Sequence, residues 1–165
     1  MASLRISVLV ISGSMGAGKT TLLGEASDLL AAAGVTHAAI DLDGLSIGHM
    51  PDDMTARNLA AVWSNYAAGG ITRLLIAEAI DSADKLERIR RAVPGAEIVV
   101  CRLRASLGTM QERVRVREPG MRQEEFVRRV VDLERAMDIE DFSVDNESRS
   151  VTEVAREVLD RAGWL

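Results

Sequence analysis

The sequence predicts an α/β protein built on a parallel sheet of five strands. Short apolar runs rich in β-branched residues alternate with helical patterns along the whole chain, which is typical of parallel α/β folds. The chain has 165 residues, of which 47% are hydrophobic and 27% charged, with three prolines, so it has the composition of an ordered globular protein. No linker, repeat or low-complexity tract interrupts it. We therefore expect one domain over residues 1–165.

The first half of the chain is predicted to form two strands and two helices. The run ISVLVI is apolar throughout and is expected to be a strand buried on both faces. Leucines and alanines at helical spacing follow it and stop at Gly34. A short second strand precedes Asp41, and a second helical pattern ends at the pair Gly69 and Gly70. The predicted elements are strands at 6–11 and 36–40 and helices at 19–33 and 55–68.

The second half is predicted to form three further strands and four helices. The runs ITRLLIA and EIVVCRL are apolar enough for buried strands, and a charged helix ended by Pro94 and Gly95 separates them. The next two helical patterns are divided by the breaker pair Pro119 and Gly120. The predicted strands are 71–77, 97–103 and 142–144, and the predicted helices are 82–92, 106–117, 122–137 and 150–161.

Charge, cysteine content and hydropathy exclude several classes of protein. A net charge of -5 argues against a general nucleic-acid binder. The single cysteine, Cys101, excludes an intrachain disulfide and a cysteine-rich zinc site. The six-residue apolar run near the N-terminus is too short for a membrane span or a signal peptide. We expect a cytoplasmic monomer or homodimer without nucleic-acid or membrane partners.

Residues 101–135 form a basic segment within this acidic chain. They hold nine arginines against six acidic residues, a net charge of +3. Such a segment indicates either a local anion site or a helix face of solvated ion pairs, and charge alone does not separate the two.

The clearest motif is a glycine-rich loop between the first strand and the first helix. It matches the phosphate-binding pattern G-x-x-x-x-G-K-[ST]. In such a P-loop, backbone N–H groups and a helix N-terminus converge on a polyphosphate, the lysine neutralises its charge, and the following threonine binds Mg²⁺. The alternative, a glycine-rich turn with a surface lysine, fits the strand-loop-helix context less well. The expected nucleotide-binding residues here are Gly13, Ser14, Met15, Gly16, Ala17, Gly18, Lys19, Thr20 and Thr21.

Carboxylates follow the second and third predicted strands. Asp41 and Asp43 lie just after the second strand, at the sheet edge where α/β proteins bind ligands. One carboxylate at this spacing can hold a metal-bound water, while the other orients or deprotonates an acceptor hydroxyl. The alternative is a simple turn. Glu78 follows the third strand, where many ATPases carry a metal-binding aspartate, or it is a carboxylate paired with a nearby arginine.

Together with the arginines around Arg113 and Arg117, these motifs resemble the small-molecule and nucleotide kinases with a P-loop. That group includes shikimate, gluconate and adenylylsulfate kinases, chloramphenicol phosphotransferase and nucleoside monophosphate kinases. The resemblance implies a sheet order of 2-3-1-4-5 and a short arginine lid at about residues 113–122. It also implies a metal role for Thr20 and Asp41, an acceptor-base role for Asp43, and phosphate contacts from Arg113 and Arg117, with Arg117 catalytic beside Lys19.

The predicted second helix lies where related kinases bind their acceptor. Arg57 and Asn58 near its start are candidate acceptor ligands, and Glu78 is a third. Trp63 and Tyr66 form either an aromatic wall or part of the core, and their helical spacing favours the core. The segment lacks a clear arginine pair for a second phosphate, which favours a neutral or weakly charged acceptor.

The sequence thus favours an ATP- and Mg²⁺-dependent phosphotransferase acting on a hydroxyl of a small molecule. One alternative is a nucleoside monophosphate kinase. Another, of a different class, is a nucleotide-binding regulatory ATPase with a macromolecular partner. Lys19 is one of only two lysines in the chain, and nothing in the sequence pattern assigns the other, Lys85, to a site.

Overall fold

The computed structural model describes residues 5–45, 48, 50–136 and 138–165. Their core is a five-stranded sheet in which all neighbouring strands are parallel. The strand order is β2-β3-β1-β4-β5, which confirms the order implied by the family resemblance. The strands are β1 (Ser7–Ser12), β2 (Ala38–Asp41), β3 (Arg73–Ala77), β4 (Glu97–Arg104) and β5 (Phe142–Asp145).

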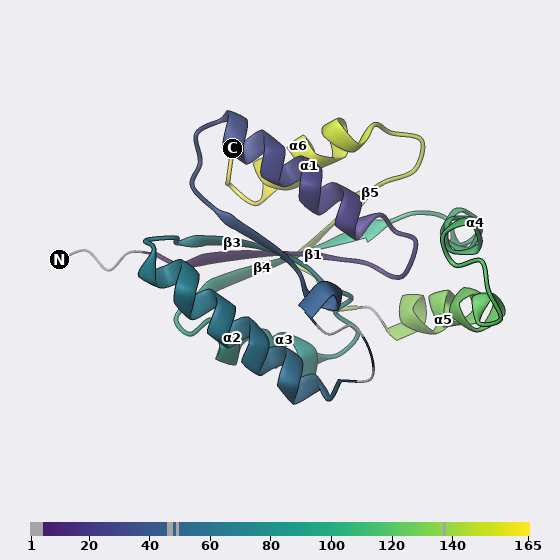
Figure 1. Ribbon diagram of the computed structural model, residues 1–165. Coiled ribbons are helices and arrows are strands. Elements are labelled where there is room, and N and C mark those ends of the chain that lie inside the picture. The colour runs from purple at the N-terminus through teal and green to yellow at the C-terminus, as the bar shows by residue number, and fades with distance from the viewer. Residues whose placement is uncertain (1–4, 46–47, 49, 137) are drawn as a thin grey trace.

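Helices cover both faces of the sheet and one of its ends (Figure 1). In the view of Figure 1, α1 (Lys19–Ala32) and α6 (Val151–Arg161) lie above the sheet. Helices α2 (Asp52–Ala68) and α3 (Ala83–Ala92) lie below it. Helices α4 (Leu107–Arg117) and α5 (Gln123–Ala136) lie at the end where the strands finish.

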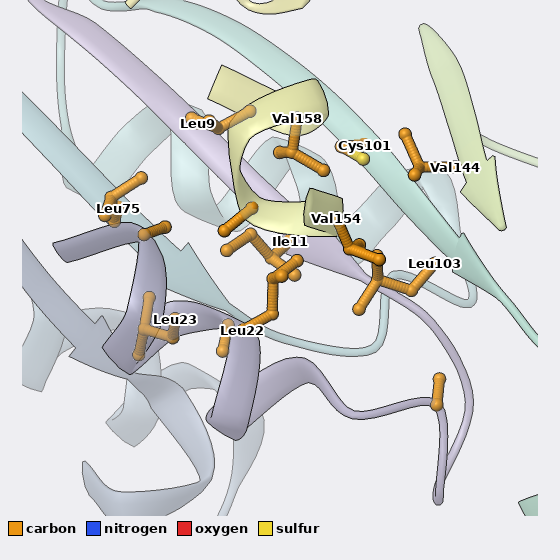
Figure 2. Close-up of a cluster of buried hydrophobic side chains, with 14 of the residues drawn as sticks. Leu9, Ile11, Leu22, Leu23, Leu75, Cys101, Leu103, Val144, Val154 and Val158 are labelled. Carbon is orange, nitrogen blue, oxygen red and sulfur yellow. The ribbon is translucent and has the colours of Figure 1, made fainter. Parts of the chain in front are cut away.

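Alternating strand residues divide the apolar core into two clusters. Leu9 and Ile11 of β1 point to the face covered by α1 and α6 (Figure 2). Val8 and Val10 point to the opposite face and pack with residues of α2 and α3. The central strand is therefore buried on both sides, as its unbroken apolar run predicts.

Helix α2 begins three residues earlier than the sequence pattern indicates. Pro51 occupies the N-cap position, and Asp52 and Asp53 lie in the first turn, where carboxylates favour the helix dipole. Arg88 of α3 contacts both carboxylates, at 2.6 Å and 3.8 Å. This tertiary ion-pair cluster stabilises a turn that apolar periodicity does not reveal.

Other boundaries differ by small steps. A short 3-10 turn, η1 (Leu42–Leu45), follows β2 and was not expected. Ser82, Ser106 and Ser150 cap helices α3, α4 and α6 from the position just before each helix. Residues 118–122 separate α4 from α5, and the predicted end of α5 at residue 137 lies outside the described residues. Within the described part of the chain, no helix is long and apolar enough to cross a membrane.

Candidate functional site

The glycine-rich loop links the end of β1 to the start of α1, as predicted. Gly16 and Gly18 both have positive φ angles, of 79° and 98°. A Cβ atom at Gly16 would overlap the backbone carbonyl of Met110, and one at Gly18 would lie 2.7 Å from the side-chain nitrogen of Asn146. These positions therefore require glycine for backbone conformation and for space.

Lys19 occupies the first position of α1 and lies among charged groups from distant parts of the chain. Its ammonium donates a hydrogen bond to the carbonyl oxygen of Ser14 over 3.1 Å. Burial lowers the pKa of Lys19, whereas the charges of Asp43 and Glu78 raise it and that of Arg117 lowers it further. The predicted catalytic residues Lys19, Asp43 and Arg117 are thus brought within electrostatic reach of one another.

Thr20 and Asp41 form the predicted metal-binding pair. The Thr20 hydroxyl donates to Asp41 Oδ2 over 2.6 Å, and the backbone N–H of Asp43 donates to Asp41 Oδ1 over 3.2 Å. In the described ranges, no group of three or more His, Cys, Asp and Glu side chains forms a metal cage. A hydroxyl beside one carboxylate still fits Mg²⁺, which uses few protein ligands and takes the rest from phosphates and water.

Glu78 lies just beyond β3 and is paired with Lys85 of α3. The Lys85 ammonium lies 3.3 Å from Glu78 Oε1 and 3.6 Å from Asp81 Oδ1, and it donates to the Ala79 carbonyl over 3.0 Å. Burial raises the pKa of Glu78, and Lys85 opposes that rise. The partner of Glu78 is therefore a lysine, and both lysines of the chain belong to this site. In the sequence, the one indication of this pairing is that Lys85 lies in the first turn of the helix that follows Glu78.

A pocket of ≈ 280 Å³ opens beside Asp43 and Glu78. Helix α2 contributes Thr55 and Leu59, while Arg129 reaches it from α5. Six of the thirteen described lining residues are charged, and none of the thirteen is aromatic. The charged members are Asp43, Asp52, Glu78, Lys85, Arg88 and Arg129.

The structure does not bring Arg57 and Asn58 to this pocket. Arg57 lines a separate groove between α2 and α3, and the Asn58 side chain donates to the Leu45 carbonyl over 3.3 Å. Thr55 and Leu59, which are four residues apart on one face of α2, line the pocket, whereas Arg57 lies on a different face. Their expected contact with the acceptor has no support from this geometry.

The aromatic residues of α2 belong to the core. Trp63 is buried, and Tyr66 packs against the same cluster as a partly buried side chain. The core interpretation favoured by their helical spacing is therefore confirmed, and no aromatic wall forms.

The two lid arginines occupy different positions. Arg113 donates to the Gly16 carbonyl over 3.1 Å and to the Asn146 carbonyl over 3.5 Å, so it ties α4 to the P-loop. Arg117 is exposed at the end of α4, where it lies 3.5 Å from Glu118. The charge of Arg117 acts on Lys19. Contact of Arg113 and Arg117 with the phosphates stays a prediction.

No protein-family model and no curated protein sequence matches the chain. Solved structures with the P-loop kinase fold do match it. A gluconokinase from Sinorhizobium meliloti 1021 superposes with a TM-score of 0.65 at 18% identity, covering 96% of this chain and 93% of that one. APS kinase from Mycobacterium tuberculosis, in complex with AMPPNP and APS, gives 0.63 at 19% identity, covering 96% and 98%.

A third similar structure is the tunicamycin resistance protein of Deinococcus radiodurans. It gives a TM-score of 0.66 at 19% identity, covering 98% of each chain. At identities of 18–19%, these superpositions show a shared fold and do not show a shared reaction.

Proposed function

We propose that the protein is an ATP-dependent phosphotransferase that transfers the γ-phosphate to a hydroxyl of a small acceptor molecule. The observation that carries the proposal is the pocket lined by Asp43, whose charge acts on the P-loop lysine, Lys19. A carboxylate between a phosphate cradle and a pocket is placed to orient an attacking hydroxyl. The small-molecule kinases among the similar structures are consistent with this reading.

Each predicted residue then has a separate task. The loop from Gly13 to Thr21 holds the phosphates through backbone N–H groups, and Lys19 and Arg117 stabilise the charge on the transferred group. Thr20 and Asp41 would hold Mg²⁺, which when bound neutralises charge on the phosphate oxygens. Asp43 accepts the hydrogen bond of the acceptor hydroxyl and directs its oxygen toward the phosphorus.

The pocket favours a small polar acceptor over a nucleotide. Its ≈ 280 Å³ suits a molecule of about the size of one sugar ring. Six charged side chains supply hydrogen-bond partners for several hydroxyl groups, and no aromatic residue among the described lining offers a surface on which a base would stack. Glu78 and Arg129 are the acceptor ligands that we propose in addition to Asp43.

The test is phosphotransfer by the purified protein to a panel of polyols, hydroxy acids, nucleotides and antibiotic hydroxyl compounds, followed as acceptor-dependent ADP release. With the acceptor in hand, Asp43→Asn should lower kcat by roughly 10²- to 10⁴-fold, the usual contribution of a general base, while ATP still binds. Asp28→Asn on the exposed surface of α1 is the matched control and should behave as the wild type.

Two outcomes would contradict this function. Full activity of Asp43→Asn at unchanged ATP affinity would remove the base assignment. Steady ATP hydrolysis that no small molecule in the panel stimulates would favour the regulatory ATPase instead.

A further inference from the structure

The side chain of Ser14 in the P-loop is buried and forms hydrogen bonds inside the protein. Ser14 is completely buried, and its hydroxyl donates to Glu134 Oε1 of α5 over 2.6 Å. The sulfur of Met110 in α4 lies 3.0 Å from the Ser14 hydroxyl oxygen. Helices α4 and α5, which lie on either side of residues 118–122, therefore both contact Ser14, the second residue of the P-loop.

The Glu134 carboxylate is itself held by a buried arginine. Arg102 of β4 is 7% exposed, and its Nη2 lies 2.9 Å from Glu134 Oε2. The same nitrogen donates to the Glu134 backbone carbonyl over 3.4 Å, in the last turn of α5. One carboxylate oxygen thus binds the sheet and the other binds the P-loop, so the orientation of Glu134 is fixed.

The backbone of Ser14 connects this contact to the Lys19 ammonium. The Ser14 carbonyl accepts the hydrogen bond of the Lys19 ammonium over 3.1 Å and that of the Ala17 N–H over 3.2 Å. Fixing the Ser14 side chain therefore fixes the peptide that orients the lysine and closes the first turn of the loop.

We propose that Glu134 is a positioning residue, which pre-organises the P-loop for nucleotide by anchoring Ser14 to α5. We call Glu134 of α5 and Met110 of α4, the two residues in contact with Ser14, the base of the lid. The proposal rests on nucleotide binding at this loop, as the proposed function does. It makes the α4–α5 base part of the phosphate site. Motion of the lid is then confined to its tip, because displacing Glu134 would break the part-buried hydrogen bond from Ser14.

A pre-organised loop binds its ligand more tightly because no ordering cost remains to be met on binding. A hydrogen bond to a charged group typically changes an equilibrium by about one to two powers of ten. We therefore expect Glu134→Ala to weaken binding of a non-hydrolysable ATP analogue by about tenfold, measured by titration calorimetry. The KM for ATP should rise in parallel, with a smaller change in kcat.

Two further variants separate positioning from folding. Glu134→Gln keeps an oxygen that accepts the Ser14 hydrogen bond, so it should restore most of the affinity. Ser14→Ala removes the same bond without leaving a charge unpaired. In the double variant Ser14→Ala/Glu134→Gln, binding should be no weaker than in Ser14→Ala alone, because both changes act through one contact.

Glu140→Gln is the matched control. Glu140 contacts Arg102 at 3.8 Å and Arg104 at 3.1 Å, and neither of these two contacts involves the P-loop. This variant should lower the melting temperature and leave the affinity for the ATP analogue unchanged. If Glu134→Ala behaves in the same way, Glu134 is merely structural and the proposal is wrong.

The readout also separates this proposal from the proposed function. Nucleotide binding that depends on Glu134 in a protein without phosphotransfer would overturn the kinase function and support the positioning role. Phosphotransfer with the same ATP affinity in wild type, Glu134→Ala and Ser14→Ala would support the kinase function and overturn the positioning role of Glu134.

Discussion

Glu78 has its carboxylate in reach of both lysines of the chain. Burial raises its pKa, while Lys85 at 3.3 Å acts in the opposite direction and Lys19 adds a weaker effect of the same sign. Replacing Lys85 by methionine removes the larger opposing charge, so the pKa of Glu78 should rise further. Where acceptor binding needs the ionised carboxylate, the acid limb of kcat/KM against pH should move to higher pH in Lys85→Met.

The pH–rate profile with the acceptor measures this shift, and Glu78→Gln is the control because it should lack that limb altogether. An acid limb that stays at the wild-type pH in both variants would assign it to another group. The free energy of unfolding gives an independent check of the direction of this pKa shift. When the pKa of a carboxyl is higher in the folded protein than in the unfolded chain, the free energy of unfolding falls as pH rises between the two pKa values. Lys85→Met should therefore make this fall larger.

At the scale of elements, α1 offers two glycines with opposite expected effects. Gly24 lies in the middle of the helix, and an added Cβ would meet no atom within 4 Å. Gly24→Ala should therefore raise the free energy of unfolding by about 0.5–1 kcal/mol, because alanine is the better helix former. ATP affinity should not change, since residue 24 is exposed and lies after the phosphate-binding residues 13–21.

Gly18 caps the same helix at φ 98° with Asn146 close by. Gly18→Ala should cost about 1–2 kcal/mol for the left-handed conformation alone, and it should weaken ATP binding. Urea denaturation and calorimetry of both variants test the pair. Equal stability of the two variants would contradict this account of the loop.

The order and type of the elements could be predicted because they depend on local patterns. The run from Ile6 to Ile11 shows a buried strand, and Gly34 shows a helix end, without any knowledge of the rest of the chain. The start of α2 does not show in apolar periodicity, although Pro51, Asp52 and Asp53 are residue types typical of a helix N-terminus. Asp52 and Asp53 also pair with Arg88, which lies on another helix.

The same distinction applies to the site. The P-loop and the pair Asp41 and Asp43 are continuous in sequence, so their chemistry is visible in the residues themselves. Glu134 contacts Ser14 across 120 positions of sequence, and Arg129 reaches the pocket from α5. Such contacts are set by the packing of the lid helices on the sheet edge, and a single sequence carries no pattern for them.

At the scale of the whole molecule, the arginines of the basic segment 101–135 divide between surface ion pairs and contacts near the P-loop and the pocket. Several of its arginines form surface pairs with nearby carboxylates, such as Arg122 with Glu125 at 2.8 Å. Others turn toward the nucleotide and acceptor region, where Arg113 contacts the P-loop and Arg129 lines the pocket. The fold thus concentrates positive charge at the end of the sheet where the phosphates would bind, while most of the molecule stays acidic.

The buried thiol of Cys101 provides a probe of how the site is coupled to the whole fold. Its side chain is 0% exposed and lies in the core cluster with Val144 and Val158 (Figure 2). Burial raises the pKa of Cys101 to about 12, so the folded protein holds almost no thiolate at neutral pH. A thiol reagent should therefore label it only after the core opens.

ATP bound to the folded state, as the proposed function requires, should slow this labelling by mass action. At an ATP concentration 100 times its Kd, the stabilisation is about 2.7 kcal/mol, which corresponds to roughly 100-fold slower labelling when reclosing is fast. Lys19→Ala should abolish the protection, while Gly24→Ala should keep it. ATP that binds by calorimetry but leaves the labelling rate unchanged would show that Cys101 is reached by local opening of α6, which would separate the stability of that face of the sheet from the nucleotide site.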